Sequence, residues 1–334
     1  MENNREKIFK RNKDLEILLK DINFLFSRIE KSVLPKFKKP KYPIIFIQGV
    51  GRSGTTLLMQ WLANSGCFSY PTNFLSRFYG APYIGAKIQQ LIFDKKYNFN
   101  NELYNFTEKI EYSSNLGKTK GALAPNEFWY FWRRFFKFDE IQILSKEQEK
   151  EVDKDTFISE IAAIEEVFKK PFVMKGMIVN WNLPFISKIS DNIFFIHIKR
   201  EPIYNIRSLL SARKKYFGNE EIWYSFKPPE YKILESLSPE EQVAGQIFFT
   251  NKAISEGLGK INQKRWIEID YELFCEQPEM IFNKIKEMLI GSGYQFDHSY
   301  NGVERFNDRN KAELLERKGD LFEKSFNKFE SGEF

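Results

Sequence analysis

The chain has 334 residues, of which 42% are hydrophobic and 29% charged, with 18 glycines and 13 prolines. This length fits roughly two domains or one large α/β domain, and the composition excludes collagen-like, coiled-coil and disordered chains. The two cysteines and two histidines are too few for a disulfide framework, a CxxC metal site or a multi-histidine site. We therefore expect a soluble globular protein without a bound metal.

The charges sum to +6, from 51 lysines and arginines against 45 aspartates and glutamates. A positive balance modestly favours anionic partners such as nucleotides, nucleic acid, acidic glycans or anionic lipid. The first residues lack the apolar stretch and cleavage site of a signal peptide, and no apolar run is long enough to span a membrane. On these grounds the expected location is the cytoplasm.

Residues 1–40 form the first expected unit, a lysine-rich segment. Apolar residues recur there at the spacing of one helix face, namely at Ile8, Leu15, Leu18, Leu19, Ile22, Leu25, Phe26 and Ile29. Pro35, Pro40 and Pro43 follow, and prolines so close together end a helix. The sequence predicts an amphipathic helix whose outer face is solvated, with an anionic membrane or another subunit as the alternative partners.

Residues 41–310 are expected to form the main domain, which begins with a strand and a helix. The run at 43–48 is continuously apolar, as in a strand buried on both faces of a parallel sheet, and residues 55–62 suit a helix. Between them lies the glycine-rich segment Gly49-Val-Gly-Arg-Ser-Gly54. The stretch at 85–170 combines polar loops, an aromatic block and a helical pattern, and we interpret it as an insertion that forms the substrate side of a site.

A second buried strand is predicted at 192–198, and Pro202 just beyond it suits the first turn of a helix. A further helical pattern at 240–256 precedes a third strand at 265–270. Strands that alternate with helices predict a three-layer α/β fold around a central, mainly parallel sheet. The chain is expected to finish in a C-terminal tail at 311–334.

Residues 49–56 fit the phosphate-binding template G-x-x-x-x-G-K-[ST], except that Thr55 stands in place of the lysine. A strand, a glycine-rich loop and a helix N-terminus still direct backbone N–H groups at an anion. A kinase or ATPase also needs that lysine and a strand-end aspartate near Mg²⁺, whereas the second strand ends in Lys199-Arg200. The loop therefore predicts a P-loop-like phosphate site, and Asp270 keeps a phosphotransferase as an alternative.

Three motifs, in chain order, resemble those of a known family. Gly51-Arg-Ser-Gly-Thr-Thr-Leu57 resembles the 5′-phosphosulfate loop of the sulfotransferases that use 3′-phosphoadenosine 5′-phosphosulfate (PAPS). Arg200-Glu-Pro-Ile-Tyr-Asn-Ile-Arg-Ser208 is similar to their 3′-phosphate motif, and Tyr271-Glu-Leu-Phe-Cys-Glu-Gln-Pro278 to their third signature. The resemblance spans residues 46–278 and implies a sulfotransferase with PAPS as its donor and no metal.

The resemblance also implies which residues bind the donor. Those expected at its 5′-phosphosulfate lie in the glycine-rich loop and at the start of the helix after it: Gly51, Arg52, Ser53, Gly54, Thr55 and Thr56. Arg200 and Ser208 are expected to clamp the 3′-phosphate, because ligands of open α/β sheets bind at the carboxyl ends of the strands and an arginine fork fits a phosphate. Arg52 has an expected catalytic role as well, since it would neutralise charge as the sulfur–oxygen bond breaks.

Two further residues are predicted to act in catalysis. Lys175 lies in a segment, 172–177, that resembles the one in which relatives place a lysine to polarise the transferring sulfonate. Glu127 lies in a Pro-x-Glu-Phe stretch similar to those of bacterial relatives, and we predict that it is the general base for the acceptor hydroxyl. The alternatives are a snorkelling surface lysine and a structural glutamate at a helix start.

The two histidines and other carboxylates are the remaining candidates for the base. His197 lies inside an apolar strand, which predicts a buried structural residue. His298 lies in a polar stretch, which predicts a surface position. Neither pattern favours catalysis over Glu127.

The predicted reaction moves a sulfonate group from PAPS to a hydroxyl of a carbohydrate or other metabolite by in-line displacement. Trp129, Tyr130 and Trp132 suit stacking on sugar rings, and a packed aromatic core explains them equally well. A nucleotide-dependent phosphotransferase is the alternative enzyme. A nucleotide- or nucleic-acid-binding module is the alternative outside enzymes, but a charge of +6 without a basic stripe favours no nucleic-acid partner.

Overall fold

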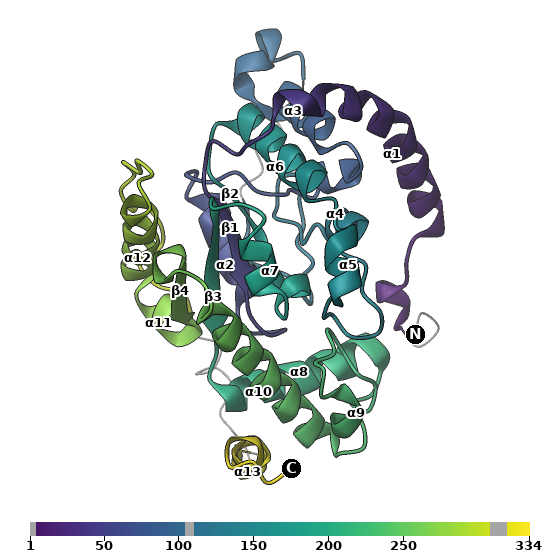
Figure 1. Ribbon diagram of the computed structural model, residues 1–334, viewed down its shortest axis with the longest axis vertical. Coiled ribbons are helices and arrows are strands. Elements are labelled where there is room, and N and C mark those ends of the chain that lie inside the picture. The colour runs from purple at the N-terminus through teal and green to yellow at the C-terminus, as the bar shows by residue number, and fades with distance from the viewer. Residues whose placement is uncertain (1–4, 104–109, 308–318) are drawn as a thin grey trace.

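The protein is described by a computed structural model at residues 5–103, 110–307 and 319–334. Its centre is a four-stranded parallel sheet with the strand order β2-β1-β3-β4. The strands are β1 (Ile44–Gln48), β2 (Phe172–Lys175), β3 (Ile193–Lys199) and β4 (Trp266–Asp270). Because all strands run in the same direction, their carboxyl ends meet along one edge of the sheet (Figure 1).

Helices connect and cover these strands. Asn12, Ser145 and Ser238 each precede a helix and accept a hydrogen bond from the N–H group three residues on, as N-cap residues do. In chain order the helices are α1 (Lys13–Val33), α2 (Thr55–Asn64), α3 (Pro82–Phe93), α4 (Trp129–Phe135), α5 (Lys146–Glu151), α6 (Lys154–Phe168), α7 (Leu183–Ser187), α8 (Pro202–Phe217), α9 (Tyr231–Leu234), α10 (Pro239–Leu258), α11 (Tyr271–Glu276), α12 (Pro278–Gly291) and α13 (Gly319–Glu330).

The sheet separates two apolar cores, because successive side chains of a strand point to opposite faces. Ile44 and Phe46 of β1 face a core that contains residues of α4, α6 and α7. Ile45 and Ile47 face the other core, against α2, α11 and α12. The predicted three-layer α/β fold with a parallel sheet is therefore confirmed.

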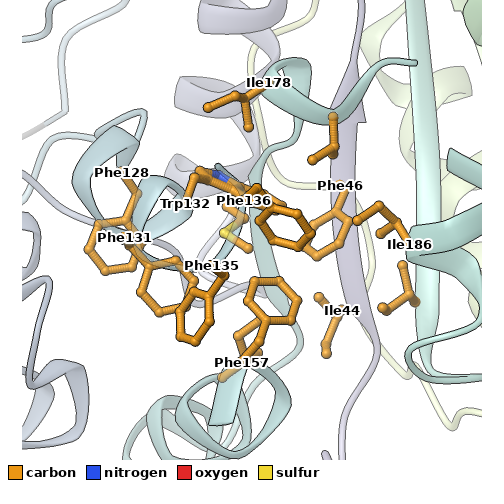
Figure 2. Packing of buried hydrophobic residues seen from close by; sticks show 14 of the residues in the cluster. Ile44, Phe46, Phe128, Phe131, Trp132, Phe135, Phe136, Phe157, Ile178 and Ile186 are labelled. Atoms are coloured by element: carbon orange, nitrogen blue, oxygen red, sulfur yellow. The ribbon is translucent and has the colours of Figure 1, made fainter. Parts of the chain in front are cut away.

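The aromatic block that follows residue 127 belongs largely to the first of these cores. Figure 2 shows its rings gathered around Phe157 of α6 and beside Phe46 of β1. The rings of Phe128 and Phe131 are stacked with their centroids 4.6 Å apart. Trp132 is completely buried, and its indole Nε1 donates a hydrogen bond to the backbone oxygen of Lys175 at 3.0 Å. This part of the predicted insertion thus anchors the end of β2.

The two ends of the chain also form helices. Within the segment predicted to be amphipathic, α1 packs through Leu19, Asn23 and Glu30, which are buried. Within the segment predicted to be a tail, α13 buries Phe322 and Phe329 in a third apolar cluster with α8 and α10; residues 311–318 of that segment lie outside the described residues. In the described ranges, no helix has the length and apolar character needed to cross a membrane.

Glu165 of α6 is a carboxyl group buried without a full set of partners. It is 1% exposed, and its Oε2 accepts a long hydrogen bond of 3.4 Å from the backbone N–H of Tyr42. Its Oε1 has no hydrogen-bond partner among the described residues. Burial raises the pKa of Glu165 from the usual 4.5 to about 9, so the folded protein holds a proton there at neutral pH.

This proton makes stability depend on pH. Between pH 4.5 and about 9 the unfolded chain releases the proton and the folded protein keeps it, so the free energy of unfolding should fall as pH rises. We expect a slope of about 1 kcal/mol per pH unit, which Glu165→Gln should remove. Urea unfolding at several pH values in this range measures the slope. The control Glu166→Gln, at the exposed neighbouring ion pair with Lys41, should keep the slope; an unchanged slope in Glu165→Gln would contradict the assignment.

Candidate active site

The glycine-rich loop at 49–54 joins β1 to α2 at the carboxyl edge of the sheet. Gly54 has a φ of 100° and Arg52 a φ of 70°, both in the left-handed region. A Cβ atom on Gly54 would lie 2.3 Å from Cδ2 of Tyr271, a closer approach than any side chain tolerates. Glycine is therefore required here both by the backbone angle and by the Tyr271 ring.

Two asparagines hold the carbonyl groups of this loop. Asn180 donates from Nδ2 to the backbone oxygen of Gly49 at 3.0 Å, and Asn205 donates to that of Gly51 at 2.9 Å. In a trans peptide the N–H group points away from the C=O group. The amide of Arg52 is therefore directed away from Asn205, as a loop that binds an anion with its amides requires.

The N-terminus of α2 completes a cradle for an anion. Gly54, which precedes the helix, has no side chain to cap it, and the first-turn N–H groups of a helix have no partner within the helix. The hydroxyl of Ser53 is buried and has no hydrogen-bond partner in the described part of the chain. These donors and the helix dipole fit a phosphate or sulfonate group.

Arg52, Arg200 and Ser208 come together beside the loop. Nε of Arg52 donates to Oγ of Ser208 at 3.3 Å, and Arg200 donates from Nη1 to the backbone oxygen of Arg52 at 3.1 Å. The guanidinium of Arg200 also lies over the ring of Tyr271, 4.9 Å from its centroid. Two positive charges and a hydroxyl therefore lie next to the anion cradle.

Lys175 links the cradle to Glu127. At the end of β2 its side chain is 3% exposed, and Nζ donates to Oγ1 of Thr56 at 2.6 Å and to Oε1 of Glu127 at 2.9 Å. Lys175 is therefore a buried cation and not a surface lysine. The Glu127 side chain is 24% exposed, so it faces solvent on one side and the lysine on the other. A carboxylate, an ammonium group and a helix N-terminus thus share one small site.

The three aromatic residues proposed to stack on a sugar have different positions. Trp129 is half-buried, and its Nε1 donates to Oε2 of Glu127 at 2.7 Å. The hydroxyl of Tyr130 donates to Glu16 of α1 at 2.8 Å. Trp132 is fully buried in the core. Only Trp129 of the three therefore contacts Glu127, and the alternative of a packed core is correct for Trp132.

Other predicted candidates lie apart from this contact. His197 is fully buried in β3, with Nδ1 3.0 Å from Oε2 of Glu268 and Nε2 3.2 Å from Oδ1 of Asn251. His298 is exposed. Thr55 is buried, and its hydroxyl donates to the sulfur of Met177 at 3.5 Å. Its contribution to the anion cradle is therefore its backbone N–H group in the first turn of α2. Glu127 is thus the candidate base that lies at the anion cradle.

Sequence reasoning missed several residues of the site. Asn205 lies within the Arg200–Ser208 motif, and its polar side chain near a helix start could have indicated a role at the site. No sequence pattern indicated Asn180, because its contact with Gly49 depends on the fold. Tyr224 was missed as well: burial raises its pKa to about 12, and the charges of Glu127 and Arg52 act on it.

A comparison with known protein families identifies the family of the chain. The sequence pattern of the sulfotransferase family matches residues 43–290. The chain therefore belongs to the sulfotransferase family, and it is an enzyme of that class. No protein of curated function matches the chain.

Solved structures add a likeness in fold. The sulfotransferase STF9 from Mycobacterium avium is similar with a TM-score of 0.50 and 12% identity, over 80% of this chain and 68% of that one. STF1 from Mycobacterium tuberculosis H37Rv has a TM-score of 0.49 and 12% identity, over 90% of this chain and 81% of that one. The sulfotransferase domain of the Synechococcus PCC 7002 olefin synthase has a TM-score of 0.39 and 18% identity, over 86% and 88%.

Gly54 provides a test of the loop geometry. Gly54→Ala should lower the free energy of unfolding by about 3 kcal/mol or more, because it adds a clash with Tyr271 to the strain of a positive φ. Gly66→Ala is the matched control, since Gly66 has a φ of 70° but open space around its Cβ position. It should cost about 1 kcal/mol. Equal costs in urea unfolding would contradict the contact with Tyr271.

Proposed function

We propose that the chain transfers a sulfonate group from PAPS to a hydroxyl of a carbohydrate or other metabolite. The observation that carries the proposal is the position of Lys175, whose Nζ contacts both Thr56 at the start of α2 and the carboxylate of Glu127. A group that stabilises anionic charge and a group that accepts a proton therefore stand side by side. Transfer of a sulfonate group to a hydroxyl needs both.

The residues around the loop fit a nucleotide that carries two anionic ends. Donor groups of Gly51, Arg52, Ser53, Gly54, Thr55 and Thr56 would hold the 5′-phosphosulfate. The buried hydroxyl of Ser53 supports this, since it has no hydrogen-bond partner among the residues that the structure describes. Arg200 and Ser208 would hold the 3′-phosphate. PAPS, when bound, supplies the sulfonate and leaves as 3′-phosphoadenosine 5′-phosphate. Arg52 belongs to the first group and contacts both Ser208 and Arg200 of the second, which suits it to balance the charge of the leaving phosphate.

Glu127 is the proposed general base. Its Oε2 is held by the indole of Trp129, and Oε1 by Lys175, so that the carboxylate has a fixed orientation. The acceptor oxygen forms a bond to sulfur while the bond from sulfur to the 5′-phosphate oxygen of PAPS breaks, and the proton of the acceptor hydroxyl passes to Oε1, which keeps a second lone pair. Lys175 stabilises negative charge on the transferring group, because a buried ammonium acts strongly where little water screens it.

The acceptor would reach Glu127 beside an aromatic wall. Trp129 contacts Glu127, and its ring lies edge-on to Phe226, with centroids 5.5 Å apart. The carbonyls of Tyr224 and Phe226 are held by Nε2 of Gln246 at 3.0 and 2.8 Å, which fixes this part of the wall. Flat, apolar ring faces next to a base suit the ring of a sugar or of another cyclic metabolite.

The donor can be tested by calorimetric titration with 3′-phosphoadenosine 5′-phosphate. We expect binding without Mg²⁺ and in preference to ATP, and about a hundredfold weaker binding in Arg200→Ala, because a charged contact to phosphate is lost. Lys199→Ala is the control: this neighbouring cation pairs with Glu268 at 2.7 Å and should leave binding unchanged. A preference for Mg-ATP would overturn the proposal in favour of a phosphotransferase.

The roles of Glu127 and Lys175 predict different kinetic effects. Glu127→Gln should lower turnover by about a hundredfold or more with little change in donor affinity, because the proton acceptor is lost while the shape remains. Lys175→Met should likewise lower turnover more than donor affinity. Glu147→Gln, exposed on α5, serves as the control. Near-normal turnover in Glu127→Gln, measured by sulfonate transfer to a model hydroxyl acceptor, would contradict its role as base.

A further inference from the structure

The outer face of α1 is apolar, with no described residue covering it. Figure 1 shows α1 along the outer edge of the molecule, with no element drawn beyond it. Its inner face is buried through Leu19, Asn23 and Glu30. On the outer face, five large apolar side chains are between 55% and 68% exposed: Ile17, Leu18, Phe24, Leu25 and Ile29. A soluble protein rarely leaves so many large apolar side chains together in water, and such patches mark interaction sites.

Two opposite charges lie in the middle of this face. Successive residues of a helix are 100° apart around its axis. One row of the outer face therefore contains Leu18, Leu25 and Ile29, and a second row contains Ile17 and Phe24. Asp21 and Arg28 lie between the two rows. Both charged residues are exposed, and Asp21 has no ion-pair partner among the described residues. Arg28 lies over the Phe24 ring, 4.9 Å from its centroid.

This charge pattern complements itself. If a second α1 lies antiparallel across a two-fold axis between Phe24 and Leu25, a residue on the midline of the face meets the midline residue whose number makes a sum of 49, and each apolar row packs against the same row of the second copy. Asp21 then meets the partner's Arg28, and Arg28 meets the partner's Asp21. Phe24 lies against Phe24 of the second copy on one side and Leu25 against Leu25 on the other, so that both ion pairs are flanked by apolar contacts. A two-fold interface requires this kind of self-complementary surface.

A membrane is a poorer fit to the same face. A helix that lies in a bilayer surface places the middle of its apolar face deepest, and here that position holds Asp21 and Arg28. Burying these charges in lipid without partners is costly, whereas a second copy supplies a partner for each. Charges within an apolar helix pair also specify its register and direction.

We propose that α1 is the interface of an antiparallel homodimer in which Asp21 of each protomer pairs with Arg28 of its partner. The proposal is independent of the sulfotransferase function. A helix of 21 residues is about 31 Å long, so one helix pair lies at the low end of stable interface sizes. The dimer should therefore form in the micromolar range and dissociate on dilution.

Sedimentation velocity of the full chain at rising concentration tests this. Leu25→Asp should abolish the dimer. Asp21→Arg should raise its dissociation constant by about tenfold or more, because two arginines would then face each other across the interface. The swap Asp21→Arg with Arg28→Asp should restore it to within about threefold of the original value, since the pairs re-form with reversed sign. Glu287→Arg, an exposed charge reversal on α12, is the control and should change nothing.

Several results would overturn the proposal. Sedimentation as a monomer at every concentration would contradict the dimer. A charge-swap variant whose dimer is as weak as that of Asp21→Arg alone would contradict the ion pairs. Flotation with phosphatidylserine vesicles that Leu25→Asp abolishes, in a chain that stays monomeric, would assign the face to a membrane instead. Circular dichroism should show all variants folded, because each changed side chain is exposed; the charge swap keeps the helix composition and decides the matter even if Leu25→Asp fails to fold.

Discussion

The site depends on one buried cation. The ammonium group of Lys175 would be costly to bury alone, and the contacts with Glu127 and Thr56 make its burial possible. Because these partners come from the segment before α4 and from the first turn of α2, the lysine joins two parts of the chain that lie far apart in sequence. The backbone oxygen of Lys175 is held in turn by Trp132, so the aromatic core determines where the cation stands.

The parallel sheet explains why these groups meet. β1, β2 and β3 are neighbours, and their carboxyl ends deliver the glycine-rich loop, Lys175 and Arg200 to one edge. At this edge Ile47 of β1 pairs with Lys175 of β2, which brings the lysine level with the start of the loop. Ligands of open α/β sheets bind at this edge for the same reason. The chemistry of the site is therefore a consequence of strand order as much as of residue type.

Much of the fold could be predicted from local patterns. Continuous apolar runs marked β1 and β3 because both strands are buried on both faces. The order of the strands could not be predicted, since one buried parallel strand resembles another. Glu127 and Lys175 were each found from a short motif, but their contact spans 48 positions and appears only in the folded chain. The different roles of Trp129 and Trp132 could not be predicted either, because both are tryptophans of one aromatic block and only their positions on α4 distinguish them.

The hydrogen bond from the Trp132 indole has a consequence for substitutions in this enzyme. Its ring packs in the core while its N–H group holds the backbone of the residue that carries the buried cation. Substitutions that displace Trp132 would therefore shift the lysine together with the packing. The carbonyls of Tyr224 and Phe226 are held by Gln246, and the Phe226 side chain packs against the same core, so this segment is also coupled to it. A change at Trp132 would therefore act on the cation of the site from a distance, through the backbone at the end of β2.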